Sequence, residues 1–529
     1  RLDDTVLDVN ITANRGDCFS VLGLAREIAA IRRLPLRGPR LVPVGPDTKL
    51  AFPVALEAKA ACPRFAGRVV EDVGTGARTP DWLRERLRRA GLRAIHPVVD
   101  VTNYVMLELG QPIHGYDRDA LSGAIVVRRA TEGERLTTLD GVDRDLDSDD
   151  LLITDDSGPI GLAGVMGGGT TELGLATTSI VIEAANFEPT GIAHAARRHK
   201  LPSEASKRFE RGVDPALPLA AATRVADLLV EFGGANAQPG VTIVGSPGQA
   251  APIEIDAGLP ARVVGIDYPA EDVARLLAAV GARVTPQEGP RLSVVPPSWR
   301  PDLTDPFDLV EEVARLHGYD AVPSVLPVAP SGRGITFEQR LRRRVERALA
   351  ASGYVEAPSY PFVGEAELDA LGLPADDARR RSLRLANPLS EEQPLLRTTL
   401  LPGLLAAVRR NVGRGTTSVG LYEAGLVVRP ESDLPLPPRL AVDHRPSDAD
   451  LAALMAAVPR QPWRVAVAAC GDWELAGWWG PARPVEWPDA IQAARAVAGA
   501  AGLDLRVERD DHAPWLPGRC AALFVGDVL

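Results

Sequence analysis

Apolar and polar residues alternate along the chain in patterns that predict a mixed α/β protein. Short apolar runs bounded by turn residues predict strands, the clearest at residues 124–130, 151–155 and 179–187. Apolar residues at helical spacing predict helices, the clearest at residues 21–33, 79–91, 271–282 and 338–353. For the second helix we expect Thr79 as the N-cap, Pro80 at the first helical position and Gly91 as the stop.

Composition shifts divide the chain of 529 residues into several regions. Pro- and Gly-rich residues predict linkers at 35–53 and 236–252. Residues 429–490 carry many Pro and Trp without a clear period, so the pattern assigns them no elements. The chain opens on Arg1 beside a strand-like run and ends on another apolar run, so we expect a piece of a longer polypeptide.

Charge and cysteine content narrow the class of protein. The net charge is −11, from 59 basic and 70 acidic residues, so bulk charge does not imply a nucleic-acid partner. The 4 cysteines are far apart and form no CxxC pair, which argues against a disulfide scaffold or zinc site and fits a reducing cytoplasm. No apolar run approaches the roughly 20 residues that a membrane helix needs, so we expect a cytoplasmic protein with no membrane contact.

The stretch RPDLTDPFDLVEEVARLHGYD, which begins at Arg300, predicts a helix that is rich in acid at its start. Asp305 is the expected N-cap, Pro306 fits the first helical position, and Gly318 is the expected stop. The expected apolar face consists of Phe307, Val310 and Ala314.

The carboxylates of this helix permit two interpretations. Asp308, Glu311 and Glu312 stand at i, i+3 and i+4 on one face, and Asp302 lies just upstream. Asp308 can complete a capping box, and Arg315 can pair with Glu311, which would make the charges structural. Alternatively, oxygen ligands of this kind bind hard cations such as magnesium. Spacing alone leaves both interpretations open.

Five stretches together resemble a known family. TANRGDCFSVLGLAREIAA, VVDVTNYVMLELGQPIHGYD, LPSEASKRFERGVDP and the acidic stretch resemble successive motifs of the bacterial phenylalanine–tRNA ligase beta subunit. NPLSEEQPLLRTTLLPGLL resembles a fifth motif, in that subunit's catalytic-like module. The order of the motifs also matches, and the resemblance covers nearly the whole chain.

The resemblance implies a multidomain α/β and α+β fold. Its expected parts are the return half of a first domain (B1-like) with a linker at 1–53, a B3/B4-type editing domain at 54–235, a winged-helix-like B5 domain at 252–326, and a class II synthetase catalytic-like antiparallel sheet module at 330–529, incomplete at its C-terminus. The family's OB-fold tRNA-binding module and its C-terminal anticodon-binding domain have no counterpart in this sequence.

The resemblance also implies partners for this chain and different roles for two kinds of subunit. The family forms an alpha2beta2 heterotetramer in which the alpha subunit makes phenylalanyl-adenylate from ATP and charges tRNA(Phe). This chain has no GxxxxGK(S/T) phosphate loop, and Arg397 is followed by hydroxyl and apolar residues where a class II motif would place a carboxylate. We therefore expect no amino-acid activation by this chain alone. Two alternatives are a free-standing trans-editing deacylase and a winged-helix nucleic-acid-binding regulator.

The chemistry expected of this chain is hydrolysis of Tyr-tRNA(Phe). An apolar pocket for phenylalanine cannot strongly reject an isostere that merely adds a hydroxyl, so a second site must recognise that hydroxyl. Glu183 is a carboxylate in an otherwise apolar strand, and from the pattern alone it could equally face water. By resemblance it matches the residue that recognises the tyrosine hydroxyl.

The resemblance assigns two sets of site residues. The expected editing pocket consists of Thr102, Asn103, His114, Gly167, Gly168, Glu183, Ser203 and Ala205. The expected ligands of Mg2+ are Asp302, Asp308, Glu311 and Glu312. No other cofactor is implied for this chain.

Overall fold

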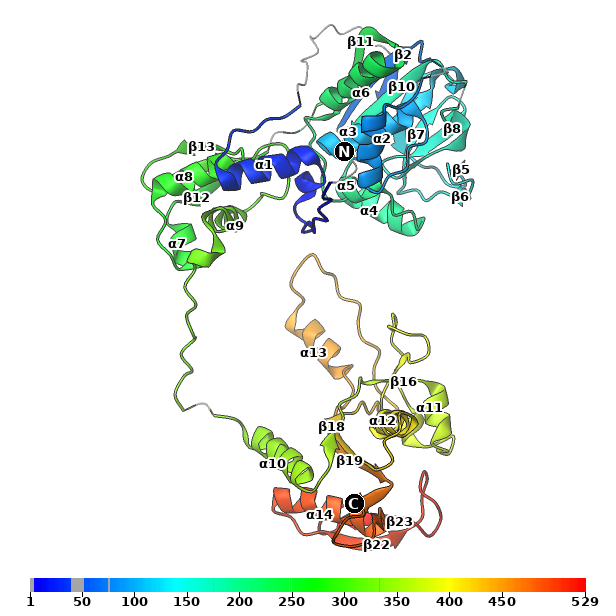
Figure 1. Cartoon of the computed structure of the whole chain (residues 1–529), viewed down its shortest axis with the longest axis vertical. Coiled ribbons are helices and arrows are strands. Elements are labelled where there is room, and N and C mark those ends of the chain that lie inside the picture. Colours follow the sequence, from blue (N-terminus) through cyan, green and yellow to red (C-terminus); the bar gives the residue numbers. More distant parts are fainter. Residues whose placement is uncertain are drawn as a thin grey trace. The chain divides into compact units, whose positions relative to one another are not determined.

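The chain forms two compact units in the computed structural model, Arg1–Leu326 and Pro327–Leu529. The structure describes residues 4–39, 52–74, 77–174, 176–246, 248, 250–332 and 334–529. Most of the expected linker at 35–53 lies outside these residues. Figure 1 shows the course of the chain, and each unit is described by itself.

The first unit contains two sheets that face each other. One is antiparallel with strand order β11-β2-β10-β3, and the other is five-stranded with order β1-β4-β7-β8-β9. The strands of the first sheet are β2 (Arg64–Glu71), β3 (Ile113–Asp117), β10 (Ile180–Asn186) and β11 (Asn236–Gly245). Those of the second are β1 (Val54–Leu56), β4 (Ile125–Arg129), β7 (Leu151–Asp155), β8 (Gly158–Leu162) and β9 (Met166–Gly167). A hairpin of β5 (Arg135–Thr137) and β6 (Asp143–Asp145) adjoins them.

Helices cover the sheet of β10 on its other face. They include α2 (Asp81–Arg89), α3 (Pro97–Leu109) and α6 (Pro218–Gly233), whereas α4 (Pro189–Arg198) and α5 (Glu204–Phe209) pack with the second sheet. In the sequence, α1 (Val21–Arg32) precedes both sheets. It begins where the Ser20 hydroxyl accepts a hydrogen bond from the Gly23 N–H at 2.9 Å.

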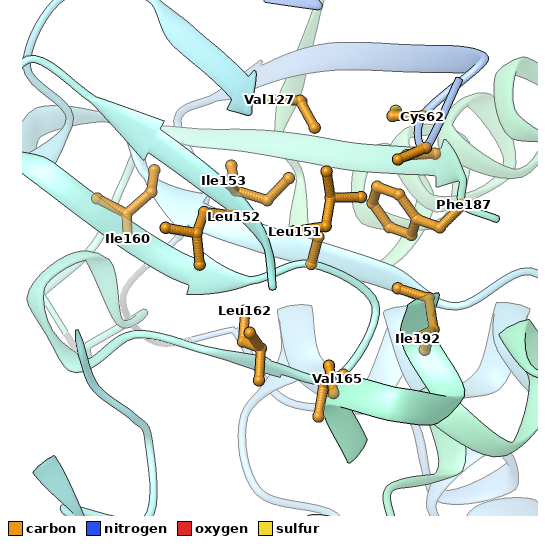
Figure 2. Close-up of a cluster of buried hydrophobic side chains, with 14 of the residues drawn as sticks. Cys62, Val127, Leu151, Leu152, Ile153, Ile160, Leu162, Val165, Phe187 and Ile192 are labelled. Carbon is orange, nitrogen blue, oxygen red and sulfur yellow. The ribbon is translucent and has the colours of Figure 1, made fainter. Parts of the chain in front are cut away.

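Alternate residues of β10 serve two different cores because side chains along a strand point to opposite faces. Ile180 and Ile182 join the helices, whereas Val181 and Ala185 join the core between the sheets. Glu183 has the same parity as Val181 and therefore faces the second sheet. Figure 2 shows that core, which includes Ile153, Leu162, Val165 and Phe187.

Two local predictions in this region are wrong. Residues 236–245 form β11 and not a linker, pairing antiparallel with β2 from Val241↔Arg68 onward. The Pro–Gly step that suggested a break falls at an irregularity in register between Ala237 and Val241. In α2, Pro80 occupies the N-cap position, and the Thr79 hydroxyl hydrogen-bonds to the buried Asp100 carboxylate.

The B5 part of the first unit is a three-stranded antiparallel sheet with three helices around it. The sheet has order β12-β14-β13, and its elements are β12 (Ile253–Asp256), α7 (Leu259–Val264), α8 (Ala270–Ala279), β13 (Arg283–Pro286), β14 (Arg291–Val295) and α9 (Pro306–His317). The predicted capping of α9 is confirmed: the Asp305 carboxylate accepts from the Phe307 N–H, and Asp308 completes a capping box. Val310 and Ala314 are buried as expected, but Phe307 is 60% exposed and does not join the apolar face.

The second unit is built around the antiparallel pair β18 (Val419–Leu426) and β19 (Trp463–Cys470), with β15 (Val355–Glu356) parallel to β18. Residues 429–490, left unassigned from sequence, include β19, three further elements and the start of a helix at Trp487. The other elements of the unit are α10 (Phe337–Ala351), β16 (Phe362–Val363), α11 (Glu365–Ala370), β17 (Leu395–Leu396), α12 (Leu401–Gly413), α13 (Asp448–Ala456), β20 (Asp472–Glu474), β21 (Arg483–Pro484), α14 (Trp487–Ala501), β22 (Arg506–Asp510) and β23 (Cys520–Phe524).

The predicted multidomain α/β and α+β class is confirmed by these sheets and helices. Within the part of the chain that the structure describes, no helix is both long and apolar enough to cross a membrane.

Candidate functional site

A small cavity opens between the two sheets of the first unit, beside α5. Its volume is about 90 Å³, room for roughly three water molecules at about 30 Å³ each. Its lining comes from β3, β7, β8, β9, β10 and both ends of α5. Most lining residues are apolar or glycine, and the polar side chains among them are His114, Tyr116 and Glu183. A mostly apolar cavity with a few convergent polar groups is the usual form of a ligand site.

The sheet register brings these polar groups together. Glu183 of β10 lies directly opposite His114 of β3. Tyr116 lies two residues further along β3, on the same face as His114, and its phenol donates a hydrogen bond to Oε2 of Glu183. The rings of His114 and Tyr116 meet edge to face, with centroids 4.6 Å apart and planes at 77°.

Burial sets the charge state of this group. Loss of solvent raises the pKa of Glu183 to about 7, and the hydrogen bond from Tyr116 opposes that rise. Burial lowers the pKa of His114 to about 4, so its imidazole is neutral at pH 7. The Nε2 atom of His114 is buried and has no hydrogen-bond partner among the described residues. The cavity therefore presents one unpaired imidazole nitrogen beside a carboxyl group that titrates near neutrality.

Two adjacent glycines, Gly167 and Gly168, have neighbours too close to admit a side chain. A Cβ at Gly167 would lie 2.5 Å from Cε1 of His114, and one at Gly168 would lie 2.7 Å from the Ile160 carbonyl oxygen. Contacts below 3.0 Å cannot be accommodated without a shift. Gly167 therefore lets β9 lie directly against the imidazole.

The structure brings four of the eight expected pocket residues to the cavity: His114, Gly167, Glu183 and Ala205. The other four are Thr102, Asn103, Gly168 and Ser203, which are not among the residues that line it. The Thr102 hydroxyl donates to the Val99 carbonyl oxygen of its own helix at 2.9 Å, and the Ser203 hydroxyl caps α5. The editing roles of all eight stay predictions.

Sequence reasoning did not select Tyr116. Its side chain is fully enclosed between the sheets and holds Glu183 directly. A signal was present, because His114 and Tyr116 are two apart in the sequence, which is the spacing of side chains on one face of a strand. Only the antiparallel register, which pairs β3 with β10, turns that spacing into a contact.

The acidic side chains of α9 lie among arginines. Arg300 binds Glu312 through two hydrogen bonds of 2.8 and 2.9 Å and also binds both oxygens of Asp302 at 2.8 Å. Arg315 binds Glu312 from the other side and reaches Glu27 of α1. The side chains of Arg300 and Glu312 are only 2% and 3% exposed. The arginines lower the pKa of Glu312 to about 2 against the opposing effect of burial.

As they lie, the four carboxylates do not fit a single magnesium ion. Asp302 and Glu312 are engaged by arginine, and one oxygen of Asp308 accepts from the backbone of Thr304 and Asp305 at 2.8 Å. Among the described interactions none involves Glu311. The predicted pairing of Arg315 with Glu311 is wrong, since Arg315 pairs with Glu312 and Glu27.

Within the described ranges, the His, Cys, Asp and Glu side chains offer one compact group of three donors. It consists of Asp510, His512 and Cys520, whose ligand atoms lie within 4.8 Å of one another on the β22–β23 hairpin. His512 and Asp510 are already hydrogen-bonded at 2.9 Å. The carboxylates of α9 form no such group.

Three family matches cover most of the chain. The B3/4 domain matches residues 61–234, the tRNA synthetase B5 domain matches 253–319, and the phenylalanyl tRNA synthetase beta chain CLM domain matches 322–529. The cavity lies within the first of these. The fold and these matches define a modular protein of the aminoacyl-tRNA synthetase class.

Curated relatives narrow that class to one family. The phenylalanine–tRNA ligase beta subunit of Streptomyces avermitilis is 55% identical over 99% of this chain, and that of Thermobifida fusca is 50% identical over 99%. Over 99% of its length the chain is thus similar to phenylalanine–tRNA ligase beta subunits. It spans 63% of the length of these two relatives. A fragment of the Pyrococcus horikoshii beta subunit is 16% identical, covers 58% of this chain and 85% of that one, and has a TM-score of 0.32, too low to carry an argument.

Proposed function

We propose that this chain is the editing and scaffolding subunit of a phenylalanine–tRNA ligase. In this proposal it hydrolyses Tyr-tRNA(Phe) and supports an alpha subunit that charges tRNA(Phe) with phenylalanine from ATP. The assembly is an alpha2beta2 heterotetramer in the cytoplasm. The observation that carries the proposal is the buried Glu183 carboxyl at the wall of a mostly apolar cavity.

A tyrosyl group differs from a phenylalanyl group only by its phenol hydroxyl, so the cavity must distinguish them at that atom. No hydrogen bond of the described residues involves Oε1 of Glu183, which can accept one from that hydroxyl. Phenylalanine would leave the same oxygen buried and unsatisfied, which costs free energy. The required discrimination therefore follows from one acceptor in an apolar wall.

His114 can serve the hydrolysis through its unpartnered Nε2 atom. Because burial lowers its pKa to about 4, the imidazole is neutral and can accept a proton from water or orient it. The cavity must widen to admit a tyrosyl ring, since about 90 Å³ is well below the roughly 300 Å³ of ordinary ligand pockets. Ala205, with a single methyl as its side chain, leaves room on one side.

The second unit supports a scaffolding role, because the arginine of its class II-like stretch, Arg397, is already paired. Arg397, in the stretch that resembles a class II motif, forms a buried ion pair with Glu423 of β18. Its guanidinium also donates to the Ser359 hydroxyl at 3.2 Å. An arginine that is neutralised inside the fold cannot clamp ATP phosphates without giving up that partner.

We therefore expect no phenylalanine-dependent ATP–pyrophosphate exchange from the beta subunit alone. Addition of the alpha subunit should restore exchange, because the phosphate clamp is expected on that subunit. The measurement is exchange by each purified subunit and by their mixture. Robust exchange by beta chain that is free of alpha would contradict the scaffolding proposal.

We also propose that Asp302, Asp308, Glu311 and Glu312 contribute to a magnesium requirement of the assembled tetramer. Binding would require Arg300 and Arg315 to release carboxylate oxygens that they now hold. Replacing Glu311 and Glu312 together by Gln should raise the magnesium concentration needed for assembly. The readout is the tetramer fraction in size-exclusion chromatography across a magnesium titration.

A matched control uses two acidic residues of α8 in the same B5 part. Glu271→Gln with Asp272→Asn removes the same charge from the first turn of α8. Neither residue is an expected magnesium ligand. This control should leave the magnesium requirement unchanged. If the magnesium concentration needed for assembly is also unchanged in the Glu311→Gln, Glu312→Gln variant, the arginines alone balance the carboxylates of α9.

The test of the editing proposal is deacylation of preformed Tyr-tRNA(Phe) by the assembled tetramer, with Phe-tRNA(Phe) as the comparison. Selective hydrolysis of the tyrosyl ester is the expected result. Absence of hydrolysis would remove the editing role from this chain.

A further inference from the structure

Tyr116 places a phenol of the protein at the Glu183 carboxyl group, which is expected to recognise the phenol of a tyrosyl ligand. It is fully buried, and its hydroxyl donates to Oε2 of Glu183. Burial and the Glu183 charge raise the pKa of Tyr116 well above 10, so the phenol keeps its proton and is the donor. One of the two carboxyl oxygens is therefore taken by the protein itself, and Oε1 is left for a ligand.

We propose that Tyr116 is a positioning residue of this pocket, which holds Glu183 through Oε2 so that Oε1 meets the ligand as an acceptor. The inference rests on the proposed editing function, and it adds a residue and a physical role that the eight expected pocket residues do not include. Glu183 touches the ligand, and Tyr116 acts through Glu183. Two phenols, one from the protein and one from the ligand, would then share one carboxylate.

The surroundings of Glu183 leave this role to Tyr116. Titratable side chains that face Glu183 are Tyr116 and His114 from β3 and Cys62 from the segment before β2. His114 is neutral at pH 7, and burial together with the Glu183 charge raises the pKa of Cys62, so that thiol stays protonated. The residues from β7, β8 and α5 that line the cavity carry no charge. Among these groups, Tyr116 is the one that donates to the carboxyl.

Donation by Tyr116 favours the ionised form of Glu183, because a hydrogen bond to a carboxylate is stronger than one to a neutral acid. The carboxyl group accordingly titrates near 7 even though it is fully enclosed. Without the phenol, burial alone would act and the pKa of Glu183 would rise further. A neutral carboxyl is a weaker acceptor, so recognition of the ligand hydroxyl should weaken at neutral pH and recover at higher pH.

The experiment is Tyr116→Phe in the full-length subunit assembled with its alpha subunit. The readout is the ratio of Tyr-tRNA(Phe) to Phe-tRNA(Phe) hydrolysis between pH 6 and 9, in which the intrinsic base lability of the two esters cancels. We expect the midpoint of this ratio to move upward by about one to two pH units, since a hydrogen bond to a charged group corresponds to a shift of that size. At pH 7 the ratio should fall roughly tenfold.

Tyr104→Phe is the matched control. Tyr104 lies in α3 outside the cavity and also donates to a carboxylate, that of Glu108 at 3.0 Å. Removing this hydroxyl makes the same chemical change in the same unit, and the pH midpoint should stay at the wild-type value. Adding Tyr116→Phe to Glu183→Gln should likewise shift nothing, because no carboxyl group remains to titrate.

Three outcomes would overturn the inference. An unchanged midpoint in Tyr116→Phe would mean that the phenol does not control Glu183. A ratio that rises at every pH would mean that Tyr116 competes with the ligand and does not position the carboxylate. Absence of Tyr-tRNA(Phe) hydrolysis by the wild-type tetramer would overturn the editing proposal and this inference together, whereas the first two outcomes leave editing intact.

Discussion

Glu183→Ala in the assembled tetramer should slow hydrolysis of Tyr-tRNA(Phe) by about ten- to hundredfold while phenylalanine charging is unchanged. A hydrogen bond to a charged group contributes roughly 1.5–3 kcal/mol, which corresponds to that range. The effect should be selective, because only the tyrosyl ester carries the hydroxyl. The measurement is deacylation of preformed Tyr-tRNA(Phe), with aminoacylation assayed on the same preparation.

Glu108→Ala is the control for loss of a partly buried acceptor. Glu108 accepts from the Tyr104 hydroxyl and pairs with Arg224, so its removal disturbs the same unit at a distance from the cavity. Editing selectivity should survive that change. Wild-type deacylation by Glu183→Ala would remove Glu183 from hydroxyl recognition.

Arg300→Met should destabilise the B5 part by up to about 3–5 kcal/mol, because it leaves the buried Glu312 with Arg315 alone and removes the arginine from the partly buried Asp302. Arg275→Met is the matched change at an exposed pair with Asp272, and it should cost less than about 1 kcal/mol. Hydrogen exchange of the α9 backbone amides reports the local free energy of unfolding in both variants. Equal exchange in the two variants would show that the Arg300 pair adds no stability.

The pH dependence of this pair has a defined sign. The pKa of Glu312 is lowered to about 2 from an ordinary value of 4.5, so the pair contributes stability above about pH 5. That contribution is lost as the pH falls from 4.5 toward 2. Protection of α9 should therefore decline in acid in the wild type and change less in Arg300→Met.

Local signals in the sequence predicted local structure well. The capping of α9 by Asp305 and Asp308 was predictable because capping depends on residues within one helical turn. The pairing of Arg315 with Glu27 was not predictable, because Glu27 lies 288 residues away and only folding brings it close. Thr79 failed as a cap for a similar reason, since the buried Asp100 takes its hydroxyl.

In the candidate site, too, some features were predictable from the sequence and others were not. Glu183 and His114 were selected through resemblance, and the register then placed them opposite each other. Their environment was not predictable, because the charge states depend on burial between two sheets that are remote in sequence. Tyr116 was missed since its role exists only in the pairing of β3 with β10.

The position of β11 has a consequence for anyone who wishes to produce the B3/4 region by itself. Both the family match, which ends at residue 234, and the expected boundary at 235 stop just before this strand. A fragment cut there would leave β2 as an unpaired edge strand, and five of its eight residues are apolar or glycine, including Phe65 and Val69. Exposed strands of that length template aggregation. Recombinant fragments should therefore extend beyond Gly245, where the last pair with β2 is made.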